Sequence, residues 1–417
     1  MAEKRIVLSN CSAIDPEDIE TYLARGGFKA LEKARSMKPK AIVEEIKQSG
    51  LTGRGGAGFN AGLKWELALK AKGKTKYLIC NADEGEVGTF KDKYILSGDP
   101  FGLIEGMAIA GLAIGAIRAY IYLRWEYHFL MDLLRQAIAQ VKTRGFLTHM
   151  DIEVFEGAGA YICGEESALM NSIEGERGES RYKPPYPPQR GLWDMPTIIN
   201  NVETLMNVPH IINNGAAWFS AMGTAKSKGT KVFSVSGDVK RPGVYELEMG
   251  SSLKELVVNL AGADDIKAIQ VGGSTGSIMP ARMIDLPLAH ESYLGSGAIV
   301  VLNSSRDIIK AVYNNMHFLN DESCGKCTPC RDGTEVIIEI LGRLVQGEGM
   351  EGDIEALEDL AQTMAVASLC GLGQAAAVPL LDSVKYFRDE YTDRIEQSTF
   401  LRSYLGGKSI EVKEGLR

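Results

Sequence analysis

Residues 77–92 have the sequence YLICNADEGEVGTFKD, in which a short apolar run passes directly into a loop rich in carboxylates. The apolar run predicts a strand over 77–80. Farther along, we expect strands over 118–123 and 151–155 and a long helix over 127–143. Strands that alternate with helices and end in glycine-rich loops indicate a layered, Rossmann-like α/β domain. Ligands of such domains gather at loops that directly follow a strand.

The apolar run over 106–117, GMAIAGLAIGAI, predicts a buried helix between the first two strands. Glu105 and Arg118 enclose it, and a membrane-spanning helix needs about twenty apolar residues. Gly111 and Gly115 would let this helix pack closely against a sheet. We therefore expect any membrane association to run through partner subunits.

The rest of the chain changes character twice. Residues 15–49 favour helices, and 198–212 look like a helix opened near Asn200 and Asn201. From about residue 228, a hairpin, a helix and further strands predict a small β-grasp domain, and amphipathic runs after 306 predict a helical bundle. The expected divisions are an N-terminal helical segment with a glycine-rich loop (1–62), the α/β domain (63–225), the β-grasp domain (226–305), the bundle (306–396) and a C-terminal tail (397–417).

Cysteines in the predicted bundle favour a metal centre. Cys324, Cys327 and Cys330 are three residues apart, and Cys370 follows later in the chain. Four thiolates can hold a [4Fe–4S] cluster, and the C-x2-C-x2-C run is typical of bacterial cluster proteins. Structural zinc on four cysteines is the alternative, although such sites more often use two C-x2-C pairs. Four unrelated core cysteines are a further alternative.

The composition is that of a globular protein and argues against some kinds of partner. The 417 residues are 45% hydrophobic, which is ordinary for a globular protein, and the formal net charge is −8. This charge and the absence of a long basic run argue against a nucleic-acid partner. The other cysteines, Cys11, Cys80 and Cys163, are scattered, and no secretory signal opens the sequence. We therefore expect a reducing, cytoplasmic environment.

Residues 53–58, GRGGAG, fit the G-x-G-x-x-G pattern, which is a weak signal alone. A helix rather than a strand precedes them, which differs from an ordinary dinucleotide fingerprint. Glycines still let the backbone approach a phosphate or a flat ring, and Lys64 would add a cation. A glycine-rich turn without a ligand remains the alternative.

Polar residues follow several predicted strands. Asn81, Asp83, Glu84 and Glu86 could contact ribose or ribityl hydroxyls, or form only a solvated loop. The pair Glu165 and Glu166 is equally ambiguous. Further candidates have simple structural alternatives, namely helix capping for Asn200, Asn201 and Thr204, and packing for Phe59 and Tyr186. The five histidines show no metal-ligand spacing, and no G-x-S-x-G or Walker A motif is present.

A cluster and a nucleotide-like pocket together suggest a division of labour. Hydride donors release two electrons at once, whereas an iron–sulfur cluster accepts one. A flavin can connect the two, because it takes a hydride and releases electrons singly.

Seven motifs occur in a characteristic order: GRGGAGF with LKW, CNADE with GTFKD, YICGEE, KPPYP, NNVET, ESCGKCTPCR and SLCGLGQAA. Together they closely resemble the NADH-binding flavoprotein subunit (51 kDa type) of bacterial respiratory complex I, NADH:quinone oxidoreductase. The resemblance implies that FMN is held by Gly53, Arg54, Gly55, Lys64, Asn81, Asp83, Glu84, Tyr161, Gly164, Glu165, Asn200, Asn201 and Thr204. It implies NADH contacts at Gly56, Phe59, Glu86, Glu166, Lys183 and Tyr186, and a [4Fe–4S] cluster on Cys324, Cys327, Cys330 and Cys370.

The resemblance also implies an activity and a setting. NADH would give a hydride to FMN, and electrons would pass singly to the cluster and onward to quinone, with Glu86 and Glu166 positioning the nucleotide. Expected partners are a small thioredoxin-like [2Fe–2S] subunit and other peripheral-arm subunits, on the cytoplasmic side of the inner membrane. A diaphorase subunit of a soluble hydrogenase or formate dehydrogenase, and a zinc-stabilised nucleotide sensor, are the alternatives.

The sequence departs from the usual family pattern at four positions. Leu67 replaces an aromatic residue, Tyr186 stands where Phe is usual, and Gly85 and Val87 flank Glu86 where Ser and Pro are common. Leu67 weakens the expectation that adenine stacks at that position.

Overall fold

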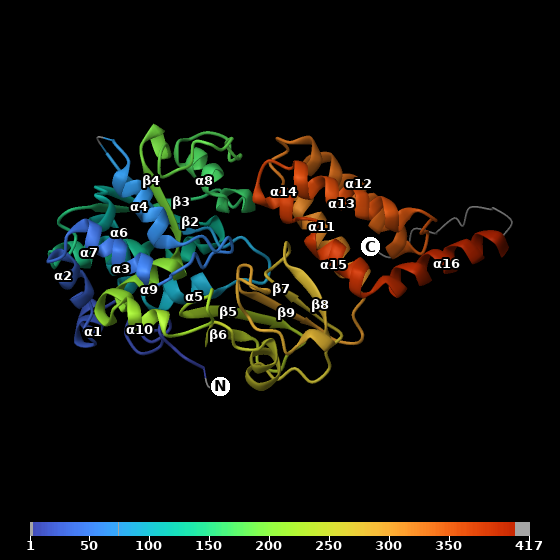
Figure 1. Ribbon diagram of the computed structural model, residues 1–417, viewed down its shortest axis with the longest axis horizontal. Helices are drawn as coiled ribbons and strands as arrows, with labels where there is room; N and C mark the ends of the chain where they lie inside the picture. Colours follow the sequence, from blue (N-terminus) through green and yellow to red (C-terminus); the bar gives the residue numbers. More distant parts are fainter. Residues whose placement is uncertain (1–2, 74, 405–417) are drawn as a thin grey trace. The chain divides into compact units, whose positions relative to one another are not determined.

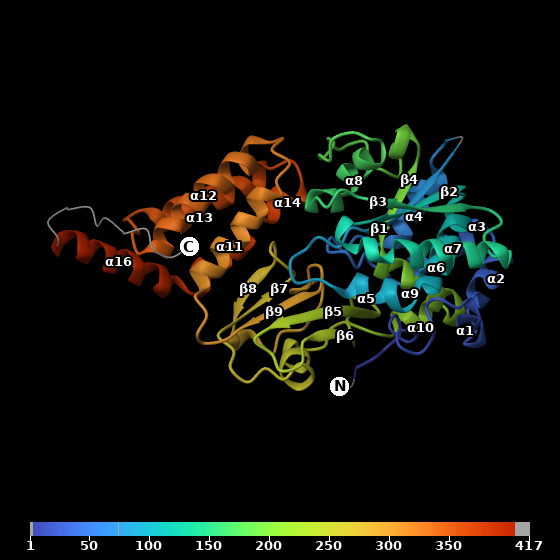
Figure 2. The ribbon, with the colours of Figure 1, turned by 180° about the vertical axis from the view of Figure 1, so that it is seen from behind.

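The computed structural model describes residues 3–73 and 75–404 (Figure 1). The chain divides into two compact units, Met1–Ser304 and Ser305–Arg417. Figure 2 shows the same ribbon from behind.

A parallel four-stranded sheet forms the centre of the first unit. Its strands are β1 (Tyr77–Ala82), β2 (Arg118–Leu123), β3 (Asp151–Glu156) and β4 (Thr197–Asn201), in the order β3-β2-β1-β4. All pairs are parallel, so the carboxyl ends of the strands lie at one edge. Three strands lie where the sequence predicts them, and the predicted α/β fold is confirmed.

The helix expected over 198–212, opened near Asn200 and Asn201, is confirmed from Val202 onward, but its first four residues belong to strand β4 instead. Residues 198–201 pair with β1, and Ile198 and Ile199 are buried. Helix α9 (Val202–Asn214) begins only afterwards, where the Asn201 side chain accepts a hydrogen bond from the main-chain N–H of Glu203. The two asparagines thus lie at the junction of a strand and a helix, where side-chain capping favours Asn.

Helix α6 (Pro100–Ile114) is the buried core helix that the sequence predicts. It packs among α2 (Lys29–Arg35), α3 (Pro39–Gln48), α4 (Ala61–Lys70), α7 (Met131–Thr143) and α9, as both views show. A Cβ on Gly106 would lie 2.2 Å from the carbonyl oxygen of Leu205, and one on Gly111 would lie 2.6 Å from Met150 Sδ. Gly115 has a different function from the one expected: its φ of +77° ends the helix.

Shorter elements connect these parts. The predicted helix over 127–143 is a 3₁₀ turn (Trp125–Leu130) followed by α7, with a kink at Tyr127. The other helical elements of the unit are α1 (Ile19–Ala24), α5 (Lys91–Gly98), α8 (Glu166–Ile173), α10 (Ala216–Ser220) and 3₁₀ turns at Tyr161–Gly164, Leu192–Asp194 and Ala281–Met283.

Within residues 3–73 and 75–404, no single helix has the length and apolar character of a membrane span. Helices α5 and α6 together have the length and composition of a membrane span, but the chain bends by 97° at their junction.

A second, mixed sheet follows in the same unit. Its strands are β5 (Thr230–Gly237), β6 (Gly243–Glu248), β7 (Ala268–Val271), β8 (Ser277–Pro280) and β9 (Ala298–Leu302), in the order β6-β5-β9-β7-β8. Only β5 and β9 pair in parallel. A helical segment at Glu255–Leu260 covers a core that includes Phe233, Leu256 and Ile299. The predicted hairpin and β-grasp arrangement are confirmed, and we call this part the five-stranded domain.

The second unit is helical, as predicted. It consists of α11 (Ile308–Asp321), α12 (Thr328–Gln346), α13 (Asp353–Ala367), α14 (Gly371–Ala375), α15 (Val378–Tyr386) and α16 (Arg388–Tyr404). The helix expected over 380–395 is in fact two, because the chain leaves helical geometry at Phe387. Of the expected tail, residues 397–404 continue α16, and 405–417 lie outside the described residues.

Candidate functional site

The predicted ligand-binding residues meet at the carboxyl ends of β1 and β4. The Asn81 side-chain amide donates to the carbonyl of Gly164 (2.9 Å), and the Asn201 amide donates to Asp92 Oδ2 (2.7 Å) and to the carbonyl of Asn81 (3.4 Å). The indole N–H of the buried Trp65 donates to Asn200 Oδ1 (2.8 Å). These bonds fix the two strand ends relative to the loops that follow β1 and β3. Parallel pairing therefore brings together residues that are far apart in the sequence.

The glycine-rich loop over 53–58 lies against the start of α9. The main-chain N–H of Arg54 donates to Thr204 Oγ1 (2.9 Å), and Gly55 lies so close to Asn201 that an added Cβ would come within 3.1 Å of the Asn201 Cβ. On the other hand, a Cβ on Gly56, whose φ is +132°, would find its nearest neighbour 3.9 Å away. The loop is thus anchored through Arg54 and Gly55, whereas a Cβ at Gly56 would make only an ordinary contact with Ser296 N. A loop without side chains at this point lets a phosphate or a flat ring approach the main chain.

The Arg54 side chain is buried. It is 1% exposed, and its guanidinium donates to the carbonyls of Thr52, Lys228 and Thr230 at 2.5 to 3.0 Å. Burial lowers the pKa of Arg54 to about 10, so it stays charged near neutral pH. Arg54 therefore anchors the loop to Thr204, to the segment before β5 and to the first residue of that strand.

Two lysine–carboxylate pairs border the site. Lys64 Nζ contacts Glu166 Oε1 and donates to the carbonyl of Ile199 (2.7 Å), while Lys183 Nζ donates to Glu165 Oε1 (2.6 Å). Glu165 also caps α8 through the N–H groups of two residues in its first turn. Burial raises the pKa of Glu165, but hydrogen bonds from Lys183 and Ser167 outweigh this effect and hold it below its ordinary value. Both carboxylates are therefore paired with lysines.

The two other acidic candidates differ in their surroundings. The Glu84 carboxylate is buried and accepts bonds from Asp92 N (2.9 Å), Lys93 N (3.0 Å) and the Tyr127 hydroxyl (3.0 Å), so it caps α5. Burial, followed by the charge of Asp92, raises the pKa of Glu84 to about 7.

Glu86, in contrast, accepts a bond from the Tyr161 hydroxyl (2.8 Å) and further bonds from the five-stranded domain. The donors from that domain are Ser274 and Thr275, which the sequence pattern does not link to Glu86. They lie in a turn between β7 and β8, and the glycine-rich run GGSTG over 272–276 is the sequence feature that marks it.

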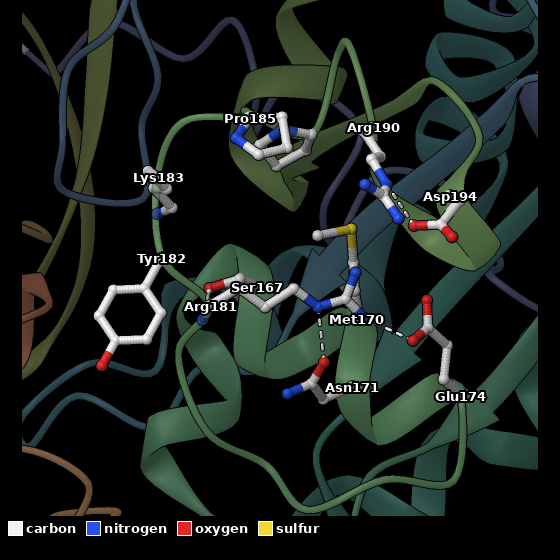
Figure 3. A pocket seen from close by; sticks show the side chains of 11 residues that line it. Ser167, Met170, Asn171, Glu174, Arg181, Tyr182, Lys183, Pro185, Arg190 and Asp194 are labelled. Atoms are coloured by element: carbon white, nitrogen blue, oxygen red, sulfur yellow. Dashed lines mark hydrogen bonds and ion pairs between the residues drawn. The ribbon is translucent and has the colours of Figure 1, made fainter.

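A cavity of about 390 Å³ lies beside Lys183 (Figure 3). In it, Arg181 points toward Asn171 and Glu174, and Arg190 pairs with Asp194. The cavity is lined by Ser167, Met170, Asn171, Glu174, Arg181, Tyr182, Lys183, Pro185, Pro187, Arg190 and Asp194. The candidate stacking residues Phe59 and Tyr186 are 55% and 53% exposed, so their rings are free of the core.

The four cysteines of the second unit converge from two helix starts. Cys327 and Cys370 precede α12 and α14, Cys330 is in the first turn of α12, and Cys324 is on the loop before it. Burial raises the pKa of Cys330 to about 11, and the nearness of the other three cysteines adds to the rise. Among the described residues, no group of three or more His, Cys, Asp or Glu is arranged to hold a metal ion as the side chains stand. The donor set is Cys330 with three further cysteines close enough to influence it.

Comparisons with known proteins identify this arrangement. Three family models match: the Nuo51 FMN-binding domain over 46–210, the SLBB domain over 232–279, and the NADH-ubiquinone oxidoreductase-F iron-sulfur binding region over 310–394. An NADH-quinone oxidoreductase subunit of Rhizobium meliloti is 44% identical over 94% of this chain and 98% of its own. The chain belongs to the Nuo51 family.

Other Nuo51 relatives work in other assemblies. NADP-reducing hydrogenase subunit HndC of Solidesulfovibrio fructosivorans is 43% identical over 94% of this chain and 84% of its own. A crystal structure of NAD⁺-reducing [NiFe]-hydrogenase in the H₂-reduced state superposes with a TM-score of 0.86 at 36% identity, covering 98% of this chain and 71% of that one. Members of the family are therefore subunits of larger oxidoreductases.

The residues present fit the cofactors of the Nuo51 family, which are FMN and a [4Fe–4S] cluster, with NADH as the substrate. The glycine-rich loop and the polar strand ends suit a flavin nucleotide, and the four thiols lie within the region that the iron-sulfur family model matches, so they suit a four-iron cluster. The chain is thus an NADH-oxidising flavoprotein subunit.

Proposed function

We propose that this chain is the NADH-oxidising subunit of an NADH:quinone oxidoreductase of the complex I type. The observation that carries the proposal is the match to the Rhizobium meliloti relative, which spans 98% of that relative at 44% identity. The quinone chemistry and any ion translocation would belong to the whole assembly.

We infer that the residues at the strand ends hold the flavin and that the neighbouring pairs hold NADH. Bound FMN supplies the conversion of a hydride into single electrons. The glycine-rich loop brings main-chain groups close to the flavin, and Lys64, fixed by Ile199 and Glu166, places a cation beside it. The exposed rings of Phe59 and Tyr186 are available to cover the nucleotide. Stacked rings bring the reacting atoms together, which lowers the entropic cost of hydride transfer.

Glu86 is the carboxylate we place near the nicotinamide. Its side chain is held by hydrogen bonds rather than by an ion pair. A carboxylate there attracts the positively charged pyridinium of NAD⁺ more than the neutral ring of NADH. Glu86 would therefore tune the relative affinity for the two nucleotides, and Glu166 would position the nucleotide from the Lys64 side.

The proposed partners are a small thioredoxin-like [2Fe–2S] subunit and the other peripheral-arm subunits, at the cytoplasmic side of the inner membrane. Nucleic acid has no part in the proposal. Electrons would leave the cluster on Cys324, Cys327, Cys330 and Cys370 toward these partners. Membrane contact would be made by partner subunits alone.

A diaphorase subunit of a soluble NAD-reducing hydrogenase is the second candidate, and the similarity to HndC and to the [NiFe]-hydrogenase structure favours it. Both candidates share the NADH half-reaction and differ in the electron acceptor. Affinity purification of the tagged chain from its host under mild detergent separates them. We expect integral membrane subunits and inhibition of NADH oxidation by quinone-site inhibitors. A co-purifying nickel–iron or molybdenum subunit would replace the first proposal by the second.

A further inference from the structure

The loop that carries Glu86 contacts the five-stranded domain at several points. Both belong to the same compact unit, Met1–Ser304. At one end, Phe90 N donates to Ser234 Oγ (2.9 Å) of β5. In the middle, a Cβ on Gly88, whose φ is +84°, would lie 3.1 Å from Val300 of β9. The acidic loop after β1 therefore lies directly against β5 and β9, two inner strands of the five-stranded domain.

The contact is most specific at Glu86 itself. Its Oε1 accepts from both the main-chain N–H (2.7 Å) and the hydroxyl (2.6 Å) of Ser274, and its Oε2 accepts from the hydroxyls of Tyr161 (2.8 Å) and Thr275 (3.4 Å). Gly273, at φ +88°, lies so close that a Cβ would come within 2.1 Å of Glu86 Cγ. A carboxylate with several donors on both oxygens has a fixed direction.

The turn that supplies these donors is itself supported. Gly272 packs against Gly295, where a Cβ would meet the Gly272 Cα at 2.4 Å, and Ser296 Oγ donates to the carbonyl of Gly272 (3.2 Å). The segment 289–297 that includes these residues also reaches the other side of the site, where His290 Nε2 lies 2.9 Å from Thr52 Oγ1. Two adjoining turns of the five-stranded domain thus contact both the acidic loop and the base of the glycine-rich loop.

We propose that the turn 272–276 is a positioning element for the nucleotide site, and that Ser274 acts through Glu86 to set the affinity for NAD⁺. The proposal rests on the proposed function of Glu86 beside the nicotinamide. Ser274 touches Glu86 and is a positioning residue rather than a catalytic one. Its hydroxyl and amide hold one carboxylate oxygen in place before the nucleotide arrives, which reduces the ordering cost of binding. The five-stranded domain is thereby part of the nucleotide site.

The test is a double-mutant cycle on the purified full-length chain with its flavin. The dissociation constant of NAD⁺ is measured by calorimetric titration in wild type, Ser274→Ala, Glu86→Gln and the double variant. Ser274→Ala should weaken NAD⁺ binding about 3- to 10-fold, because one charge-assisted hydrogen bond is lost while three others remain. In the Glu86→Gln background, Ser274→Ala should change the dissociation constant of NAD⁺ less than about twofold. The effects of two residues that act through one another do not add. Ser274→Thr should restore binding, and flavin content should stay constant throughout.

Ser304→Ala is a matched control. Ser304 also donates from its N–H (3.2 Å) and its hydroxyl (2.7 Å) to a single carboxylate, Asp265, but beyond the end of β7 that is opposite the turn. It should leave NAD⁺ binding unchanged. Thr275→Val, which removes only the 3.4 Å contact, should have a smaller effect than Ser274→Ala.

Equal effects of Ser274→Ala in both backgrounds would overturn the inference while leaving the proposed function intact. Failure of the wild-type protein to bind NAD⁺ at all would instead refute the proposed function. Should Ser274→Ala lose its flavin or its folded state, Ser274→Thr and Thr275→Val still decide between the outcomes.

Discussion

Replacing Glu203 by Gln should destabilise the first unit strongly, because this carboxylate holds a fully buried charge cluster together. Its Oε2 lies 2.6 Å from Lys231 Nζ and 3.0 Å from Lys91 Nζ, and Lys91 also pairs with Asp92 at 2.8 Å. All four side chains are at most 3% exposed. Glu203 Oε1 in addition accepts from Val232 N (2.8 Å). Two lysines and two carboxylates thus join α9 and α5 to β5.

The expected loss in the free energy of unfolding follows from the removal of one charge from a buried cluster. Removing one partner of a buried pair costs about 3 to 5 kcal/mol, because the remaining charge keeps its burial cost and loses its attraction. Burial already lowers the pKa of Lys231 to about 7, against about 10.4 in the unfolded chain. The variant can therefore release that proton. Since the unfolded state binds more protons above pH 7, the stability of the variant should rise toward about pH 9 and recover part of the loss.

Urea unfolding followed by tryptophan fluorescence at two pH values measures both effects. Glu66→Gln is the matched control, because Glu66 also holds two lysines, Lys47 at 2.9 Å and Lys70 at 2.6 Å, but on the surface. We expect its unfolding midpoint to stay close to that of the wild type, since exposed pairs contribute little. A Glu203→Gln midpoint as close to the wild type as that of the control would refute the argument that the cluster depends on this carboxylate.

Three further outcomes are expected. Cys370→Ser should remove the iron and acid-labile sulfide but leave the FMN content unchanged, and a full iron complement would exclude Cys370 as a ligand. Glu86→Gln should weaken NAD⁺ binding more than NADH binding at unchanged flavin content, and identical constants for both nucleotides would remove its assignment. Burial lowers the pKa of His210 to about 4, so between about pH 6.5 and 4 the unfolded chain binds the extra proton and stability falls as the pH falls. His210→Gln should lose less stability over this interval, and equal acid unfolding curves would contradict this.

Local patterns were sufficient for most of the fold. The apolar run at 77–80 forms a strand and the periodic runs after 306 form helices, as predicted. The sequence does not predict strand β4, because it is short and leads directly into a strongly helical segment. Pairing with β1, rather than local propensity, decides the conformation of residues 197–201. The break at Phe387 is equally invisible in the helical periodicity of 380–395.

The candidate site was less predictable because its contacts are non-local. Glu86 and Ser274 are 188 positions apart, and no local pattern links them. For Arg54, the resemblance implies an FMN contact, but only packing decides that the guanidinium turns toward the carbonyls of Lys228 and Thr230. Glu84 similarly looks like a ligand-binding carboxylate and serves in the structure as a buried helix cap. Side chains adjacent in a motif can thus have separate functions.

An anaerobic titration of the purified chain with NADH tests the central claim most directly, because it follows the flavin by absorption and the cluster by electron paramagnetic resonance in one sample. We predict that NADH bleaches the flavin absorption and that the signal of a reduced [4Fe–4S] cluster appears, with four iron atoms and one FMN per chain. A colourless protein that contains zinc, or a yellow protein whose spectrum NADH does not change, would contradict the account.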